Sequence, residues 1–121
     1  MTVEQRDVFL FRPTFDTNLR DHLFIVLSGA DANRYEQTFI AVMITSSALY
    51  DDDFSFHLTD EMFEKPLPKK GSHVRMHLIV LCVEKDIKGQ HAINRMKPAY
   101  FKHMMDAIND LVFDNKFTPN S

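Results

Sequence analysis

The chain of 121 residues contains no tryptophan, one cysteine, three glycines and five prolines. A single thiol, Cys82, cannot form an internal disulfide or a four-cysteine zinc site, and free cysteines are usually buried. Because glycine and proline are scarce, no low-complexity linker divides the chain, and we expect one domain over residues 1–121. The chain also lacks the apolar run of roughly 18 residues that a membrane span needs, so we expect no membrane association.

Further absences narrow the function. The first residues lack the cationic stretch and apolar run of a secretory signal peptide, so we expect a cytoplasmic protein. The formal net charge of −3 disfavours the broadly basic surface of proteins that bind nucleic acid without regard to sequence. No G-x-x-x-x-G-K, G-x-G-x-x-G, G-x-S-x-G or H-E-x-x-H motif occurs, which disfavours nucleotide-binding proteins and the common hydrolases.

Runs of β-branched and aromatic residues, separated by turn residues, predict a series of short strands. These runs cover residues 7–12, 23–27, 38–45, 53–58, 72–83 and 91–96. The run at 38–45 is apolar on both faces and is expected to be central in its sheet. In the run at 53–58, alternation places Phe54, Phe56 and Leu58 on the inward face. Residues 13–22 predict a loop.

The hydrophobic period changes near the C-terminus. From Phe101, apolar residues follow the spacing of a helix with one buried stripe. Pro98 suits the first helical turn, and Asn115 is expected to end the helix. The pattern predicts a mainly β fold: a small β-barrel over about residues 7–96, closed by a C-terminal α-helix over about residues 98–114.

The segment from Ser72 to Leu78 is the most informative. Alternate residues of a strand share a face, so His73, Arg75 and His77 would stand in a row, about 6.6 Å apart. A fixed cation between two groups that titrate near neutrality suits an anionic phosphate and proton transfer. A solvated outer face without function would show the same pattern, and that interpretation stays open.

We expect no metal site. On a strand His73 and His77 lie roughly 13 Å apart, too far for one zinc ion. The acidic run at residues 51–53 lacks the glycine and the spaced ligands of a calcium loop, which indicates a solvated turn.

Polar side chains also gather at two predicted strand ends, where functional groups are common. Arg20 and His22 end the loop before the second strand. Thr45, Ser46 and Ser47 end the central strand, although the Thr45 hydroxyl could equally cap a turn.

The order of these segments resembles the MazF/PemK/Kid toxins of bacterial type II toxin–antitoxin modules. The similarity spans about residues 7–113. The matching segments are Asp7-Val8-Phe9-Leu10, Phe24-Ile25-Val26-Leu27-Ser28, Asn33-Arg34-Tyr35, Ile40-Ala41-Val42-Met43-Ile44-Thr45-Ser46, Val74-Arg75-Met76-His77 and Arg95-Met96-Lys97-Pro98.

This resemblance implies an SH3-like barrel of the CcdB/MazF type, a homodimer, and metal-independent, cofactor-free cleavage of single-stranded RNA at short sequences. It also implies a cognate antitoxin as partner. Aligned on Asn33-Arg34, a family arginine falls on His22. The family's strand-end threonine and arginine are kept as Thr45 and Arg75, whereas His77 replaces its acidic residue.

The residue pattern and the resemblance together assign two sets of residues. The catalytic set is His77, Arg75, His22 and Thr45. The RNA-binding set is Arg20, His73, Ser46 and Ser47. In this scheme His22 and His77 form an acid–base pair, Arg75 stabilises charge and Thr45 donates a hydrogen bond to phosphate.

Other interpretations stay open. Loss of the acidic residue at position 77 could have ended catalysis and left a binding protein. Gyrase-poisoning toxins of the CcdB family share the fold and bind their target through the C-terminal helix, for which an exposed Phe113 would be an indication. A structural or phage-encoded binding module without toxicity is a third class.

Overall fold

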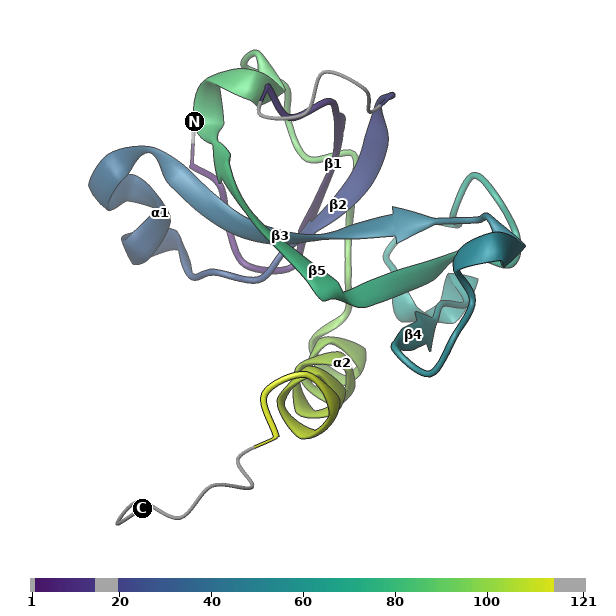
Figure 1. Cartoon of the computed structure of the whole chain (residues 1–121). Coiled ribbons are helices and arrows are strands. Elements are labelled where there is room, and N and C mark those ends of the chain that lie inside the picture. The colour runs from purple at the N-terminus through teal and green to yellow at the C-terminus, as the bar shows by residue number, and fades with distance from the viewer. Residues whose placement is uncertain (1, 15–19, 115–121) are drawn as a thin grey trace, which may run out of the picture.

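The computed structural model describes residues 2–14 and 20–114, in which six strands form one antiparallel, curled half-barrel sheet (Figure 1). The strand order is β4-β5-β3-β2-β1-β6. The strands are β1 (Asp7–Phe11), β2 (His22–Val26), β3 (Thr38–Thr45), β4 (Ser55–His57), β5 (His73–Val83) and β6 (Asn94–Arg95). The helices are α1 (Ala30–Glu36) and α2 (Pro98–Leu111), with short 3₁₀ turns η1 (Ala48–Tyr50), η2 (Asp60–Met62) and η3 (Glu84–Ile87).

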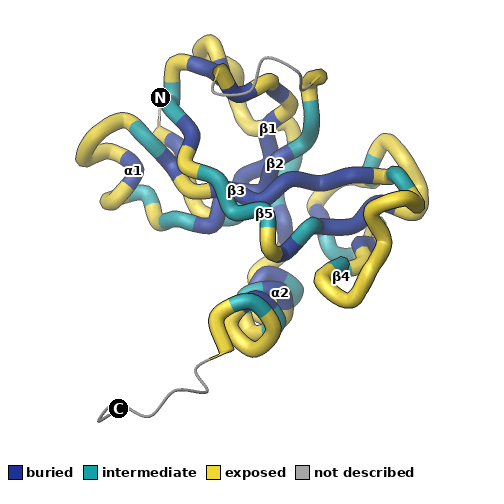
Figure 2. Tube along the Cα trace, in the orientation of Figure 1, coloured by how far each residue is buried: buried dark blue, intermediate teal, exposed yellow. Residues whose placement is uncertain are grey.

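The predicted fold class is confirmed: a mainly β architecture with a C-terminal helix. The strand expected to be central, β3, lies between β2 and β5 and is buried along most of its length (Figure 2). Helix α2 begins at Pro98, which stands in its first turn as predicted, and the helix ends at Leu111. Asn115, the predicted helix end, and residues 15–19 of the predicted loop lie outside the described residues. No helix in the described ranges is long and apolar enough to cross a membrane.

The sheet buries side chains on both faces. On one face, Phe101, Met104 and Ile108 of α2 pack against residues of the four central strands. On the other face, the curl of the sheet encloses a phenylalanine-rich cluster, in which the Phe11 and Phe24 ring centroids lie 4.8 Å apart. Cys82 belongs to this second cluster and is 1% exposed, as predicted. Burial raises the pKa of its thiol to about 12.

The prediction for residues 53–58 is only partly right. Leu58 is buried, and Phe56 is half-buried against the cluster around Phe101, Met104 and Ile108 of α2, here called the α2-side cluster. Phe54 is 40% exposed, so its expected inward orientation is wrong. The Asp52 carboxylate accepts a hydrogen bond from the Phe54 amide, which holds residue 54 in a turn before β4 begins at Ser55.

Strand β5 bends in its middle. In its pairing with β3, Ile79 lies opposite Val42 and Val74 lies opposite Ile44. An advance of two residues along β3 therefore corresponds to five residues along β5. The three additional residues form an irregularity that bends the strand sharply (Figure 1). Residues 75–78 lie at this bend, which the alternating sequence pattern did not indicate.

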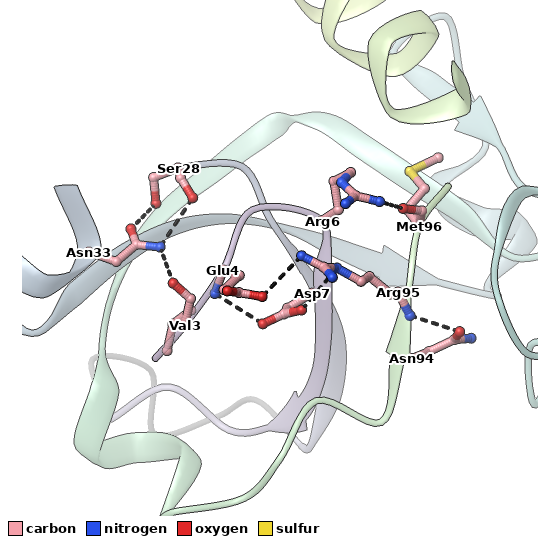
Figure 3. Close-up of polar contacts among 9 residues, drawn as sticks. All are labelled: Val3, Glu4, Arg6, Asp7, Ser28, Asn33, Asn94, Arg95 and Met96. Atoms are coloured by element: carbon pink, nitrogen blue, oxygen red, sulfur yellow. Dashed lines mark hydrogen bonds and ion pairs between the residues drawn. The ribbon is translucent and has the colours of Figure 1, made fainter. Parts of the chain in front are cut away.

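A buried amide ties the N-terminal segment to the sheet (Figure 3). The Asn33 side chain of α1 donates hydrogen bonds to the Val3 carbonyl (2.8 Å) and the Ser28 carbonyl (3.1 Å). It accepts a hydrogen bond from the Ser28 hydroxyl, which in turn accepts one from the Ile40 amide of β3. The Asn33 and Ser28 side chains together therefore connect four segments of the chain.

A second polar cluster holds β6 (Figure 3). The Arg95 guanidinium pairs with Glu4 at 3.1 Å and Asp7 at 3.5 Å, and Arg6, at a φ of 78°, reaches the Met96 carbonyl. Burial is the main influence on Asp7 and raises the pKa of its carboxyl.

Candidate functional site

Five of the eight predicted site residues line one pocket, here called the β2–β3 pocket, with a volume of about 480 Å³. His22 begins β2 and Arg20 precedes it, whereas Thr45 ends β3 and is followed by Ser46 and Ser47. The antiparallel pairing of β2 with β3 brings these two strand ends together. Lys69 and Ser72 also line the pocket, and sequence reasoning had given neither a role.

Thr45 has a structural contact inside this pocket. Its side chain is buried, and the hydroxyl oxygen accepts a hydrogen bond from the Ser47 amide at 3.2 Å. The turn-capping interpretation is therefore correct. Because the hydroxyl accepts this bond, its own proton remains able to donate to a ligand.

Of the other three predicted residues, Arg75 and His77 lie on a neighbouring surface, here called the β4–β5 face, and His73 lies on the same side of β5 but is buried. Val74 and Met76 are buried in the α2-side cluster, so His73, Arg75 and His77 point to the opposite side, as the alternation predicts. His77 is exposed and Arg75 is half-buried.

His73 is the exception to the predicted row. His73 is 1% exposed, so its side chain cannot make the predicted direct contact with RNA in this structure. Thr45 and His57 are its direct neighbours across the sheet, and the His57 ring centroid lies 5.9 Å away. The row of His73, Arg75 and His77 therefore begins at a residue that is buried between β3 and β4 and not in solvent. Within the described chain, His73 Nε2 has no hydrogen-bond partner.

Arg75 is a cation without an acidic partner. Its guanidinium stacks on the Tyr50 ring at 4.5 Å, and Nη2 lies 3.3 Å from His77 Nε2. Since arginine has only donors, the imidazole nitrogen must accept this hydrogen bond. In the described ranges no carboxylate lies within ion-pair distance of Arg75. A half-buried, unpaired guanidinium beside an imidazole is well suited to bind a phosphate.

Two functional candidates on this face were missed. His57 of β4 lies directly opposite His73, and its Nε2 is 2.9 Å from Asp51 Oδ1. This hydrogen bond is the main reason why the pKa of Asp51 is lowered. The sequence pattern predicts a solvated turn at residues 51–53 and gives Asp51 no functional role. Alternation along β4 could have shown that His57 points away from the core, but not that Asp51 meets it.

The pocket and the face adjoin at one point. Thr45 and Ser72 line the β2–β3 pocket, while His73 is the register partner of Thr45 and the chain neighbour of Ser72. Neither Arg75 nor His77 lines the pocket. The structure therefore divides the predicted site into a pocket with His22 and an adjoining face with Arg75 and His77. Across residues 2–14 and 20–114, no three His, Cys, Asp or Glu side chains are grouped as metal ligands.

Several solved structures share this architecture. The MazF toxin of Deinococcus radiodurans (Form-I) matches with a TM-score of 0.69 and 12% identity, over 93% of this chain and 98% of that one. An endoribonuclease in complex with its cognate antitoxin, from a mycobacterial species, matches with a TM-score of 0.67 and 12% identity, over 97% and 98%. A MazE–MazF complex of D. radiodurans (Form-III) gives 0.67 and 13%, over 95% and 100%.

The fold is therefore that of the MazF-type endoribonuclease toxins, and the resemblance found in the sequence is confirmed at the level of fold. No protein-family model matches the chain, and no curated protein sequence does either. At 12–13% identity the chain is a divergent example of this fold.

Proposed function

We propose that this protein is the toxin of a type II toxin–antitoxin system and that it cleaves single-stranded RNA without a metal ion. The observation that supports this most strongly is Arg75, an unpaired guanidinium stacked on Tyr50 and 3.3 Å from His77, on a fold shared with MazF toxins. The guanidinium would bind the scissile phosphate and stabilise the charge that develops on it. His77 would exchange a proton with the reacting oxygens.

The β2–β3 pocket would hold the neighbouring part of the RNA. Arg20 and Lys69 supply positive charge beside the hydroxyls of Thr45, Ser46 and Ser47, all of which can hydrogen-bond phosphate or ribose. His22 is the second proton-transfer group in the scheme that the resemblance implies. We further propose that the protein acts in the cytoplasm as a homodimer and that a cognate antitoxin inhibits it.

The direct test is cleavage of a long single-stranded transcript by the purified protein in EDTA. We expect cleavage, and we expect Arg75→Ala and His77→Ala each to lower the rate by roughly 10²-fold or more. His103→Ala, an exposed histidine on α2, is the matched control and should cleave like the wild type. An inactive wild type, or full activity in both site variants, would refute the proposal. Loss of cleavage in EDTA would refute metal independence.

One observation favours a second candidate, a toxin that binds a protein as the CcdB family does. Phe113, just beyond α2, is 57% exposed and lines an apolar groove of about 280 Å³ with Ile40 and Met105. Growth arrest without RNA cleavage, abolished by Phe113→Ser and accompanied by capture of a topoisomerase, would support this candidate over the nuclease.

A further inference from the structure

The hydrogen bond between His57 and Asp51 defines which nitrogen of His57 can react. The pKa of Asp51 is lowered, so its carboxylate is ionised near neutral pH and can only accept hydrogen bonds. His57 Nε2 must therefore carry a proton, and this N–H group donates a hydrogen bond to Asp51 Oδ1. When the ring is neutral, the lone pair is on Nδ1, which is then the nitrogen that can take a proton.

His57 is also placed beside the proposed phosphate site. Ser55 pairs with Arg75 and His57 pairs with His73, and directly opposite residues of antiparallel strands point to the same side. His57 on β4 is thus the diagonal neighbour of Arg75 on β5, about 7 Å away. His77 is the next outward position after Arg75 along β5. Asp51 follows Tyr50, whose ring supports the Arg75 guanidinium. The side chains of His57 and Asp51 are 64% and 45% exposed, so a substrate can reach them.

We infer that His57 is the general base of the RNA-cleaving reaction and that Asp51 is its positioning residue. This inference rests on the proposed function and changes one of its assignments, because His57 takes the place of His22. His22 lines the β2–β3 pocket, whereas His57 shares the β4–β5 face with both Arg75 and His77. A carboxylate orients the His57 ring, and in the described chain no polar partner orients that of His22.

The proposed step balances as follows. His57 Nδ1 takes the proton of the ribose 2′-hydroxyl, and the 2′-oxygen forms a bond to the adjacent phosphorus. The bond between phosphorus and the 5′-oxygen breaks, and His77 gives a proton to that oxygen. To act as this acid, His77 must first give up the hydrogen bond that its Nε2 accepts from Arg75 and take a proton from water. The products are a 2′,3′-cyclic phosphate and a 5′-hydroxyl, and the two histidines exchange protons with water before the next turnover.

The test compares four single variants with the wild type on a long single-stranded transcript in EDTA. We expect His57→Ala to lower the rate by roughly 10²-fold or more, and His22→Ala to weaken RNA binding while changing the rate at saturating RNA less than tenfold. Asp51→Asn should lower the rate by at least about tenfold, because an amide no longer fixes the tautomer. His91→Ala, at an exposed position away from both sites, is the matched control.

The pH profile separates a catalytic role from a structural one. The titratable groups that contact His57 are Asp51 and His73, and the charged Arg75 lies diagonally across the β4–β5 pair, opposite Ser55. The acid limb of the wild-type pH–rate profile should be absent in His57→Ala, whereas a variant that affects structure alone would keep it. Added imidazole should restore part of the lost activity, since the site is exposed. Thermal unfolding should be unchanged in His57→Ala.

The possible failures are distinguishable. An active wild type with an equally active His57→Ala variant overturns the role of His57 and leaves the proposed function standing. Loss of turnover in His22→Ala with normal turnover in His57→Ala returns the base to the pocket and also overturns the inference. A wild type that cleaves no RNA overturns the proposed function, and the catalytic role of His57 with it.

Discussion

Replacing Asn33 with alanine would remove the buried amide that joins α1 to the N-terminal segment and to Ser28. Three hydrogen bonds are lost, to the Val3 carbonyl, to the Ser28 carbonyl and from the Ser28 hydroxyl. Because Asn33 is 2% exposed, water cannot replace these bonds without an opening of the structure. At a net value of about 1 kcal/mol for each bond, the loss is about 3 kcal/mol.

A smaller effect acts in the opposite direction. Position 33 lies inside α1, and alanine has a better helix propensity than asparagine by roughly 0.5 kcal/mol. We therefore expect Asn33→Ala to lower the free energy of unfolding by about 2.5 kcal/mol. Such a loss is large against the total stability of about 5–15 kcal/mol that is typical of a domain.

Urea unfolding followed by circular dichroism measures this change, with the slope checked for two-state behaviour. Arg34→Ala is the matched control, because it lies in the same helix and removes only the surface pair between Arg34 and Asp31. We expect the control to change the unfolding free energy by less than about 0.5 kcal/mol. An Asn33→Ala variant as stable as that control would refute the proposed role of the buried amide.

Three further predictions concern the core and the buried titratable groups. Cys82 should not react with a thiol reagent in the native protein at pH 8 and should react fully in urea, because burial raises its thiol pKa to about 12; rapid native labelling would contradict this. Ile108→Ala should lower the free energy of unfolding by about 2–5 kcal/mol through cavity formation, whereas Lys102→Ala on the exposed side of α2 should change it by less than about 0.5 kcal/mol. Burial raises the pKa of Asp7 above its unfolded value, so its stabilising contribution is fully present below the ordinary carboxyl pKa and is lost as pH rises through the raised value. The stability of the wild type relative to Asp7→Asn should therefore fall between pH 3 and pH 7, and a rise would refute the assignment.

Local patterns determined much of the architecture. The alternation that places His73, Arg75 and His77 opposite Val74 and Met76 is a property of any extended backbone, so it could be predicted without knowledge of the partner strands. The helical stripe that begins at Phe101, and the proline in the first turn of that helix, are equally local, which is why the C-terminal helix was found near its true position.

What the sequence could not determine is which side chains meet across the sheet. His73 is buried where β5 pairs with β3 on one side and β4 on the other in a particular register. Asp51 reaches His57, six residues further along the chain, across the turn that precedes β4. Register depends on contacts between segments far apart in the chain, and no spacing within one strand reveals it. The sequence by itself therefore indicated the face on which chemistry could occur, whereas the tertiary structure alone decided which histidine on that face is held by a carboxylate.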